Sequence, residues 1–188
     1  MNSIAVFCGS SSGKNHTYRK EAAAFGKYLV DQGTDLVYGG GKVGLMGILA
    51  DSVIDAGGKV TGIIPRFLKT KEVAHENLTE LIVVESMHQR KEMIYDLSDG
   101  FIALPGGYGT LDEYFEMLTW GQLGLHPKPV GLLNIEGYFD RILAFLDHMV
   151  REGFVHEINR SMVLMSNRKE DLFEQMLAYK APVVPKWL

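Results

Sequence analysis

Short β-branched runs alternate with longer stretches of helical period along the chain, and this alternation limits the choice of fold more than any other feature. The runs predict strands at residues 4–7, 35–38, 59–64, 80–85, 100–104 and 129–133, and a further apolar piece lies near Val163. The periodic stretches predict helices at residues 18–32, 43–56, 87–97, 110–122, 138–152 and 169–179. Connections of this length are typical of parallel crossovers, so we expect an α/β fold with an open, doubly wound parallel sheet flanked by helices.

The length of the chain fits one such sheet. A (β/α)8 barrel needs roughly 250 residues, whereas this chain has 188, of which 46% are hydrophobic. The sequence contains no repeat or linker, so we expect residues 1–188 to form a single Rossmann-like domain. The 80–85 run reads Glu-Leu-Ile-Val-Val-Glu, and its continuous apolar core predicts a central strand buried on both faces.

Charge and cysteine content argue against several classes of function. The 19 basic and 23 acidic residues give a net charge of −4, which argues against binding to nucleic acid or to an anionic membrane surface. Cys8 is the single cysteine, so neither an intrachain disulfide nor a thiolate zinc site can form within one chain. The six histidines show no metal-ligand spacing, and no apolar stretch approaches the ~18 residues of a membrane span. We therefore expect a cytoplasmic protein without a bound metal.

Three of the predicted strands end in glycine-rich turns that lead toward helices. They are Cys-Gly-Ser-Ser-Ser-Gly at residues 8–13 (turn 1), Gly-Gly-Gly-Lys-Val-Gly at 39–44 (turn 2) and Pro-Gly-Gly-Tyr-Gly-Thr at 105–110 (turn 3). The carboxyl ends of parallel strands share one edge, so the three turns are expected to converge on the crevice where such folds bind ligands. Glycines let backbone N–H groups approach phosphate oxygens, and a helix N-terminus adds positive potential. The simplest ligand is a phosphorylated small molecule.

Two better-known phosphate motifs fit these turns poorly. Gly39, Gly41 and Gly44 match GxGxxG, but the acidic ribose partner expected about 20 residues further on is missing. Turn 1 resembles a P-loop, yet Asn15 stands where Ser or Thr is needed to hold magnesium. Neither a dinucleotide site nor an NTPase is favoured. Each turn taken alone is also compatible with an ordinary strand-to-helix connection.

Two cations open the helix that follows the 80–85 strand. Arg90 and Lys91 share a face with Met87 and Ile94. The structural alternative is a pair of solvated cations with packed apolar stems. Their place at the carboxyl end of a strand favours a role beside the crevice.

Glu113 has two competing interpretations. Thr110 and Glu113 match the spacing of a capping box, in which Thr caps the helix and the acid bonds back to it. Alternatively, Glu113 and Glu116 form a carboxylate pair that faces the sugar of a nucleotide, while turn 3 holds its phosphate. Carboxylates suit an oxocarbenium-like transition state and the activation of water, and they need no metal.

The segment Pro-Gly-Gly-Tyr-Gly-Thr-Leu-Asp-Glu at 105–113 matches PGGxGTxxE. Together with Met-His-Gln-Arg-Lys at 87–91 and the turns CGSS and YGGGxxGLMG, it makes the chain similar to the LOG ("lonely guy") family from the first strand to about Phe154. The resemblance implies that Arg90 and Glu113 are the catalytic pair and that turn 3 binds phosphate. The residues it places in substrate binding are Ser10, Gly41, Met87, Lys91, Gly106, Gly107, Gly109, Thr110 and Glu116.

The resemblance also implies an activity. Members of the family hydrolyse the N-glycosidic bond of cytokinin riboside 5′-monophosphates, many of them also of AMP, and release the free base and ribose 5-phosphate without a cofactor. They are usually homodimers, so we expect a homodimer here. The label lysine decarboxylase, often given to such sequences, fits poorly, because nothing in the chain supplies the residues that pyridoxal phosphate chemistry needs.

Three questions stay open at this point. A relative on the same fold that carries a nucleotide or molybdenum cofactor without turning it over would use the same glycine turns. The motifs do not rank cytokinin nucleotides above AMP. They also do not decide whether Glu113 or Glu116 is the dominant carboxylate.

Overall fold

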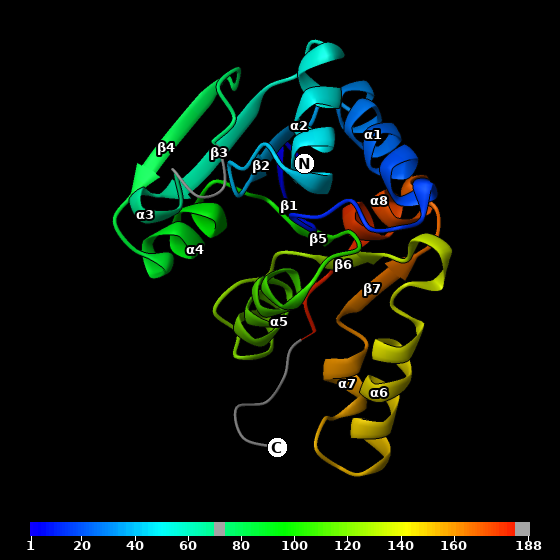
Figure 1. The fold of residues 1–188 in the computed structure, drawn as a ribbon. Helices are drawn as coiled ribbons and strands as arrows, with labels where there is room; N and C mark the ends of the chain where they lie inside the picture. Colours follow the sequence, from blue (N-terminus) through cyan, green and yellow to red (C-terminus); the bar gives the residue numbers. More distant parts are fainter. Residues whose placement is uncertain (70–73, 183–188) are drawn as a thin grey trace.

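The computed structural model describes residues 1–69 and 74–182 and contains a seven-stranded, fully parallel sheet (Figure 1). The strand order is β4-β3-β2-β1-β5-β6-β7, so the chain builds outward from β1 in one direction and then from β5 in the other. The predicted doubly wound α/β fold is confirmed. The strands are β1 (Ser3–Phe7), β2 (Asp35–Tyr38), β3 (Val60–Pro65), β4 (Glu80–Val84), β5 (Phe101–Ala103), β6 (Val130–Leu133) and β7 (Val163–Ser166).

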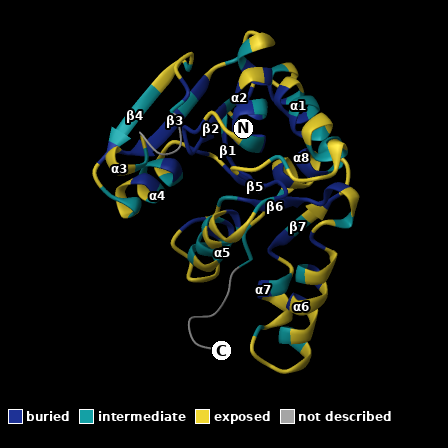
Figure 2. Ribbon diagram, in the orientation of Figure 1, coloured by how far each residue is buried: buried dark blue, intermediate teal, exposed yellow. Residues whose placement is uncertain are grey.

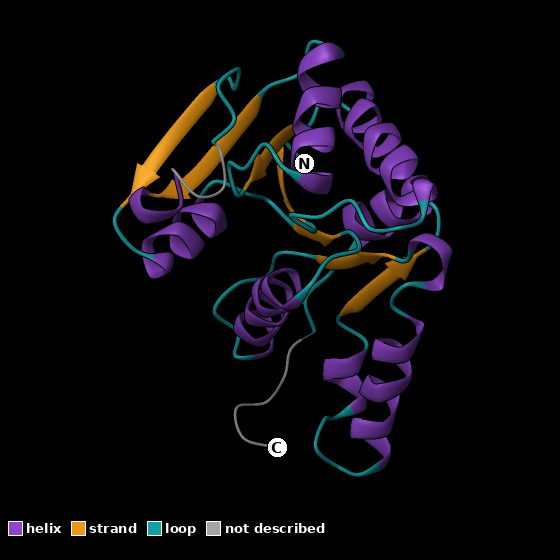
Figure 3. Ribbon diagram, in the orientation of Figure 1, coloured by secondary structure: helices purple, strands orange, loops and turns teal. Residues whose placement is uncertain are grey.

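Helices cover both faces of the sheet (Figure 3). The first face carries α1 (His16–Asp31), α2 (Gly44–Asp55) and α8 (Lys169–Ala178). The second carries α4 (Met87–Asp96), α5 (Tyr108–Gln122) and α6 (Asp140–Arg151). The short elements α3 (Arg66–Lys69), the 3₁₀ turn η1 (Ile135–Gly137) and α7 (Glu157–Arg160) were not predicted from the sequence.

The residues of β1 show why the sheet is buried on both sides. Ile4 and Val6 point into the core under α1, α2 and α8, whereas Ala5 and Phe7 point into the core under α4, α5 and α6. Successive side chains of a strand alternate between faces, so a run without a polar residue fits only a strand covered twice. The central strands are accordingly dark blue in Figure 2.

The position of β4 corrects one expectation. The 80–85 run was expected to be a central strand buried on both faces, but β4 lies at the edge of the sheet. Glu80 is exposed, Leu81, Ile82 and Val83 are half-buried, and Val84 alone is buried (Figure 2). The crossover from β4 to β5 carries the chain past three strands, so α4 begins at this edge and leads back toward the centre.

The described helices include none that is both long and apolar enough to cross a lipid bilayer.

Candidate functional site

The three glycine turns meet at the carboxyl edge of the sheet, as expected. The N–H of Gly9 in turn 1 donates to the carbonyl of Pro105 in turn 3 at 3.0 Å. The carbonyl of Gly9 accepts from the N–H of Leu45, just after turn 2, at 2.9 Å. Gly44 has a φ of +64°, and a Cβ there would lie 2.3 Å from the carbonyl carbon of Ser10. Turn 1 is therefore packed between the other two.

Turns 1 and 3 enclose a cavity of about 300 Å³. Ser10, Gly106 and Gly107 line it, which places three of the expected substrate-binding residues on one pocket. Tyr18 of α1, Leu45 of α2 and Tyr138 complete its wall. A pocket made largely of backbone suits a phosphate, because its donors are N–H groups.

The N-terminus of α5 carries no side-chain cap. Its N-cap residue is Gly107, so the helix begins two residues earlier than predicted. The first N–H groups of a helix have no acceptor within the helix. In α1 and α4 one of them is bonded by the side chain of Asn15 or Ser86. In α5 no side chain bonds the first N–H groups, so they are available to an anion.

The expected capping box at Thr110 and Glu113 is wrong. Thr110 lies inside the first turn of α5 and is buried, with its hydroxyl below Gly106. A Cβ on Gly106 would clash with that hydroxyl oxygen at 2.1 Å. Glu113 therefore lies a full turn inside the helix and does not form a capping box with Thr110.

Arg90 lies under turn 2 and is 6% exposed. Its Nη2 donates to the carbonyl of Gly39 at 3.2 Å, and its Nη1 lies 3.9 Å from the sulfur of Met87. The buried Nε–H has no acceptor among the described residues. A buried N–H donor without an acceptor is costly, so Arg90 is arranged to meet an anion or a polar ligand.

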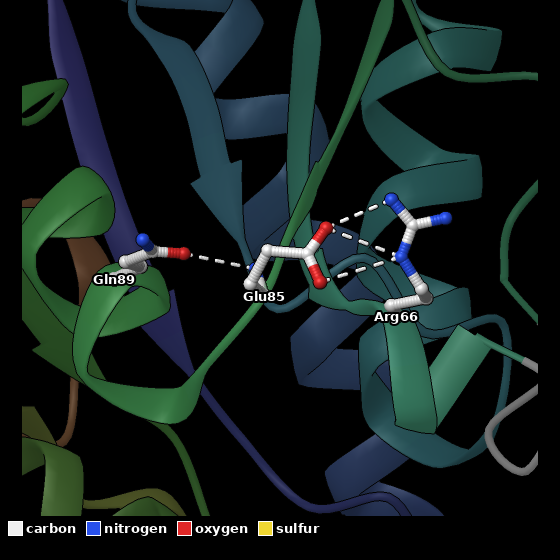
Figure 4. A network of polar contacts seen from close by, with 3 residues as sticks. All are labelled: Arg66, Glu85 and Gln89. Atoms are coloured by element: carbon white, nitrogen blue, oxygen red, sulfur yellow. Dashed lines mark hydrogen bonds and ion pairs between the residues drawn. The ribbon is translucent and has the colours of Figure 1, made fainter.

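A polar network holds the start of α4, on which Arg90 sits (Figure 4). Arg66 directly follows β3, and its guanidinium donates hydrogen bonds to the carboxylate of Glu85, with Nη2 and Oε1 2.8 Å apart. The backbone N–H of Glu85 donates to the side-chain oxygen of Gln89 at 2.9 Å. The contacts are exposed and add little stability, but they fix where the first turn of α4 lies relative to β3 and β4.

Lys91 joins α4 to α5. Its Nζ lies 2.9 Å from a carboxylate oxygen of Asp112 and 2.9 Å from one of Glu116. Burial lowers the pKa of Lys91, but the hydrogen bonds and charges of Glu116 and Asp112 outweigh it, so the net pKa is raised. Lys91, Glu113 and Glu116 surround one small gap that has no room for a water molecule. The carboxylate of Glu116 is thus already paired with the ammonium group of Lys91.

Glu113 lies close enough to Cys8, at the end of β1, to affect its titration. Burial raises the pKa of the Cys8 thiol, and the negative charge of Glu113 raises it further. The thiol stays protonated and is no nucleophile. The Glu113 carboxylate therefore lies near the carboxyl end of β1, the edge at which doubly wound sheets bind ligands.

Gly41 makes a different contact from the other predicted residues. It forms an isolated antiparallel bridge with Ala74, and the neighbouring carbonyl of Gly40 accepts from the N–H of His75. Gly109 has open space where a Cβ would stand. Sequence reasoning missed Tyr18 and Tyr138, since no motif marks them, and it did not predict the contact of Gly39 with Arg90.

Among the described residues, no group of three His, Cys, Asp or Glu side chains is placed to hold a metal ion.

Comparison with known proteins agrees with this geometry. A sequence model of the family described as "Possible lysine decarboxylase" matches residues 46–176. The chain is 48% identical to "Cytokinin riboside 5'-monophosphate phosphoribohydrolase LOG2" of Arabidopsis thaliana, over 97% of this chain and 84% of that protein. It is 47% identical to LOG7 of the same plant, named for the same activity, over 94% of this chain and 82% of that protein.

Solved structures show the same fold at lower identity. The molybdenum cofactor binding protein of Rippkaea orientalis is 24% identical, with a TM-score of 0.69 over 94% of this chain and 96% of that one. The molybdenum cofactor carrier protein of Chlamydomonas reinhardtii is 20% identical, with a TM-score of 0.69 over 94% and 98%. At such identities the likeness concerns the fold alone. The family match and the high identity to LOG2 and LOG7 over most of both chains go further: this chain belongs to the LOG family of phosphoribohydrolases.

Proposed function

We propose that the protein hydrolyses the N-glycosidic bond of nucleoside 5′-monophosphates, namely cytokinin riboside 5′-monophosphates and AMP, and releases the free base and ribose 5-phosphate. One observation carries the proposal. The uncapped N-terminus of α5 opens beside turn 1, and the same helix carries Glu113 one turn further along. A phosphate at the helix end and a carboxylate deeper in the crevice suit the two ends of a ribose 5-phosphate unit.

In the proposed reaction, the C1′–N bond breaks and its electron pair leaves with the base, which takes up a proton. Positive charge develops on the ribose, and the negative charge of Glu113 stabilises it. Water adds its oxygen to C1′ and gives one proton to Glu113, the general base. Glu113 then releases this proton to solvent, which balances the proton that the departing base takes up from solvent. We assign this role to Glu113 because it holds the acidic position of the PGGxGTxxE motif and lies one turn into the helix whose N-terminus is proposed to bind the phosphate.

The remaining expected site residues bind and orient the substrate in this proposal. Arg90 supplies a buried positive charge with an unused N–H donor. Gly106, Gly107, Gly109 and Thr110 form the start of α5 and cradle the phosphate. Met87 and Lys91 flank Arg90 on α4, and Ser10 and Gly41 belong to turns 1 and 2.

The test is incubation of the purified protein with AMP and with isopentenyladenosine 5′-monophosphate. We expect free adenine or isopentenyladenine together with ribose 5-phosphate in equal amounts, measured by chromatography. If both nucleotides bind and neither loses its base, the protein is a nucleotide carrier on the same fold and the proposal is wrong.

We further infer that residues 1–188 act as one domain, that the protein works as a homodimer and that it is cytoplasmic. The continuous sheet supports the first point. An open, partly apolar hollow of about 430 Å³ along α5, lined by Leu111, Phe115 and Trp120 among others, supports the second. A phosphorylated metabolite as substrate supports the third.

A further inference from the structure

Tyr138 belongs to none of the sequence motifs, yet it touches turn 3. Its hydroxyl donates a hydrogen bond to the carbonyl oxygen of Gly106 at 2.5 Å, across 32 residues of chain. Its ring meets the ring of Tyr18 edge-on, with centroids 5.7 Å apart and an angle of 81°. Both rings line the cavity that turns 1 and 3 enclose.

A strained turn brings Tyr138 to this place. Glu136 has a φ of 54° and is the one non-glycine residue with a positive φ in the described part of the chain, and Gly137 follows with a φ of 68°. A left-handed conformation is costly for a residue with a side chain. The buried Asn134 holds the turn, because its side chain accepts from the N–H of Phe139 and donates to Asp140, both at 2.7 Å.

The bond to Gly106 acts on the peptide group that enters the helix. The carbonyl of Gly106 and the N–H of Gly107, the N-cap of α5, belong to one peptide unit. A donor on that carbonyl polarises the unit and strengthens its N–H as a donor. The preceding carbonyl, of Pro105, is occupied by the N–H of Gly9 at 3.0 Å. The carbonyls of Pro105 and Gly106 are thus both engaged, and the N–H groups that follow remain for an anion.

We propose that Tyr138 is a positioning residue for phosphate binding: through the Gly106 carbonyl it fixes turn 3 and strengthens the backbone donors that hold the 5′-phosphate. This inference rests on the proposed function, since it assigns the phosphate of the substrate to turn 3. Tyr138 acts through the backbone and takes no part in bond cleavage.

The test is Tyr138→Phe, which removes the hydroxyl and keeps the ring against Tyr18. One neutral hydrogen bond contributes about 0.5–1.5 kcal/mol, so we expect the KM for AMP to rise roughly threefold to tenfold. The kcat is expected to stay within about twofold, because the phosphate is bound alike in ground and transition states. Tyr28→Phe is the matched control: its ring meets that of Phe173 edge-on with centroids 5.7 Å apart, and it lies outside the cavity that turns 1 and 3 enclose.

Calorimetric titration with ribose 5-phosphate, AMP and adenosine separates this role from a structural one. We expect Tyr138→Phe to weaken the binding of ribose 5-phosphate and of AMP by the same factor and to leave the binding of adenosine unchanged. A similar loss for adenosine, or the same loss in Tyr28→Phe, would overturn the proposal. So would unchanged affinity for both phosphates. Because binding is measured directly, the result stands even if the wild-type protein releases no base from AMP, the outcome that would refute the proposed function instead.

Discussion

The guanidinium of Arg90 occupies the space that a side chain on Gly39 would need. Arg90 donates to the carbonyl of Gly39 at 3.2 Å, and a Cβ on Gly39 would lie 2.0 Å from the same Nη2. Gly39 stands directly after β2, 51 residues from Arg90 in sequence. The glycine is therefore needed for close approach of the arginine.

Gly39→Ala is expected to displace the guanidinium and lower the turnover of AMP at least about tenfold, roughly 1.4 kcal/mol in barrier height. The melting temperature should change by only a few degrees, because the displaced atoms are the end of a flexible side chain. Adenine release and calorimetry measure the two effects. Gly121→Ala is the control: it lies in α5, where a Cβ meets the flexible end of Met162 at 3.0 Å, and it should keep wild-type turnover. Equal activity of the two variants would contradict the role of Gly39.

Glu113→Gln is expected to lower turnover by about 10²–10⁴-fold, the usual contribution of a general base. The fold should remain, because α5 begins at Tyr108 and Glu113 does not cap it. AMP binding, measured by calorimetry, should persist. A variant that keeps more than about a tenth of wild-type turnover, a loss below roughly 1.4 kcal/mol, would transfer the role to Glu116.

Adenosine is expected to be a much poorer substrate than AMP. Each charge-assisted hydrogen bond to the phosphate contributes about 1.5–3 kcal/mol, so the loss of even one such bond should lower kcat/KM by roughly tenfold or more. Parallel assays of the two compounds at equal concentration measure the ratio. Equal turnover would show that the end of α5 does not bind the phosphate.

The apolar surface around α5 is expected to form a homodimer interface. Leu123, at the end of the helix, is 63% exposed, so Leu123→Glu should not disturb the core but should yield a monomer. Phe154→Glu alters a residue that is 85% exposed beyond α6 and should leave the dimer intact. Light scattering at micromolar concentration gives the masses, and a monomeric wild-type protein would refute the prediction.

His126 is expected to make the protein less stable in mild acid. Burial, reinforced by the charge of Lys128, lowers the pKa of His126, whose Nε2 lies 2.8 Å from the carbonyl of Met117. The unfolded chain therefore binds this proton at a higher pH than the folded one. Its contribution to stability is complete above about pH 6.5 and is lost as the pH falls through the lowered pKa of the folded state.

The measurement compares melting temperatures at pH 7.5 and pH 5. His126→Gln should show a smaller decrease than the wild-type protein, whatever its own stability. The exposed His156 provides the control for loss of one histidine, and His156→Gln should keep the wild-type decrease. If the melting temperature of His126→Gln falls as much between pH 7.5 and pH 5 as that of the wild-type protein, the assignment to His126 is wrong.

Much of the architecture could be predicted because each strand is short, apolar and followed by a glycine turn. The expected strand at 35–38 matches β2 residue for residue. The edge position of β4 could not be predicted from its sequence. The order of the strands depends on how the crossover helices pack against the sheet, and the same apolar run is compatible with a central or an edge strand. The start of α5 was missed because Thr110 and Glu113 happen to have capping-box spacing.

The candidate site was predictable only where its residues share a local motif. Turn 3 and the two cations Arg90 and Lys91 on α4 can be recognised in the sequence. The Tyr138–Gly106 and Arg90–Gly39 contacts join residues 32 and 51 positions apart, and such pairing arises from tertiary packing. Nothing in the local sequence of Tyr138 indicates its neighbour.

The close packing of Gly44 against Ser10 affects how a ligand enters the pocket between turns 1 and 3. Turn 1 is also bonded to turn 3 through Gly9, so contacts within the protein hold the mouth of the pocket. A site with its donors already in place loses little conformational entropy on binding. We therefore expect a nucleotide to bind at this edge in a single step, with an observed rate that rises linearly with nucleotide concentration.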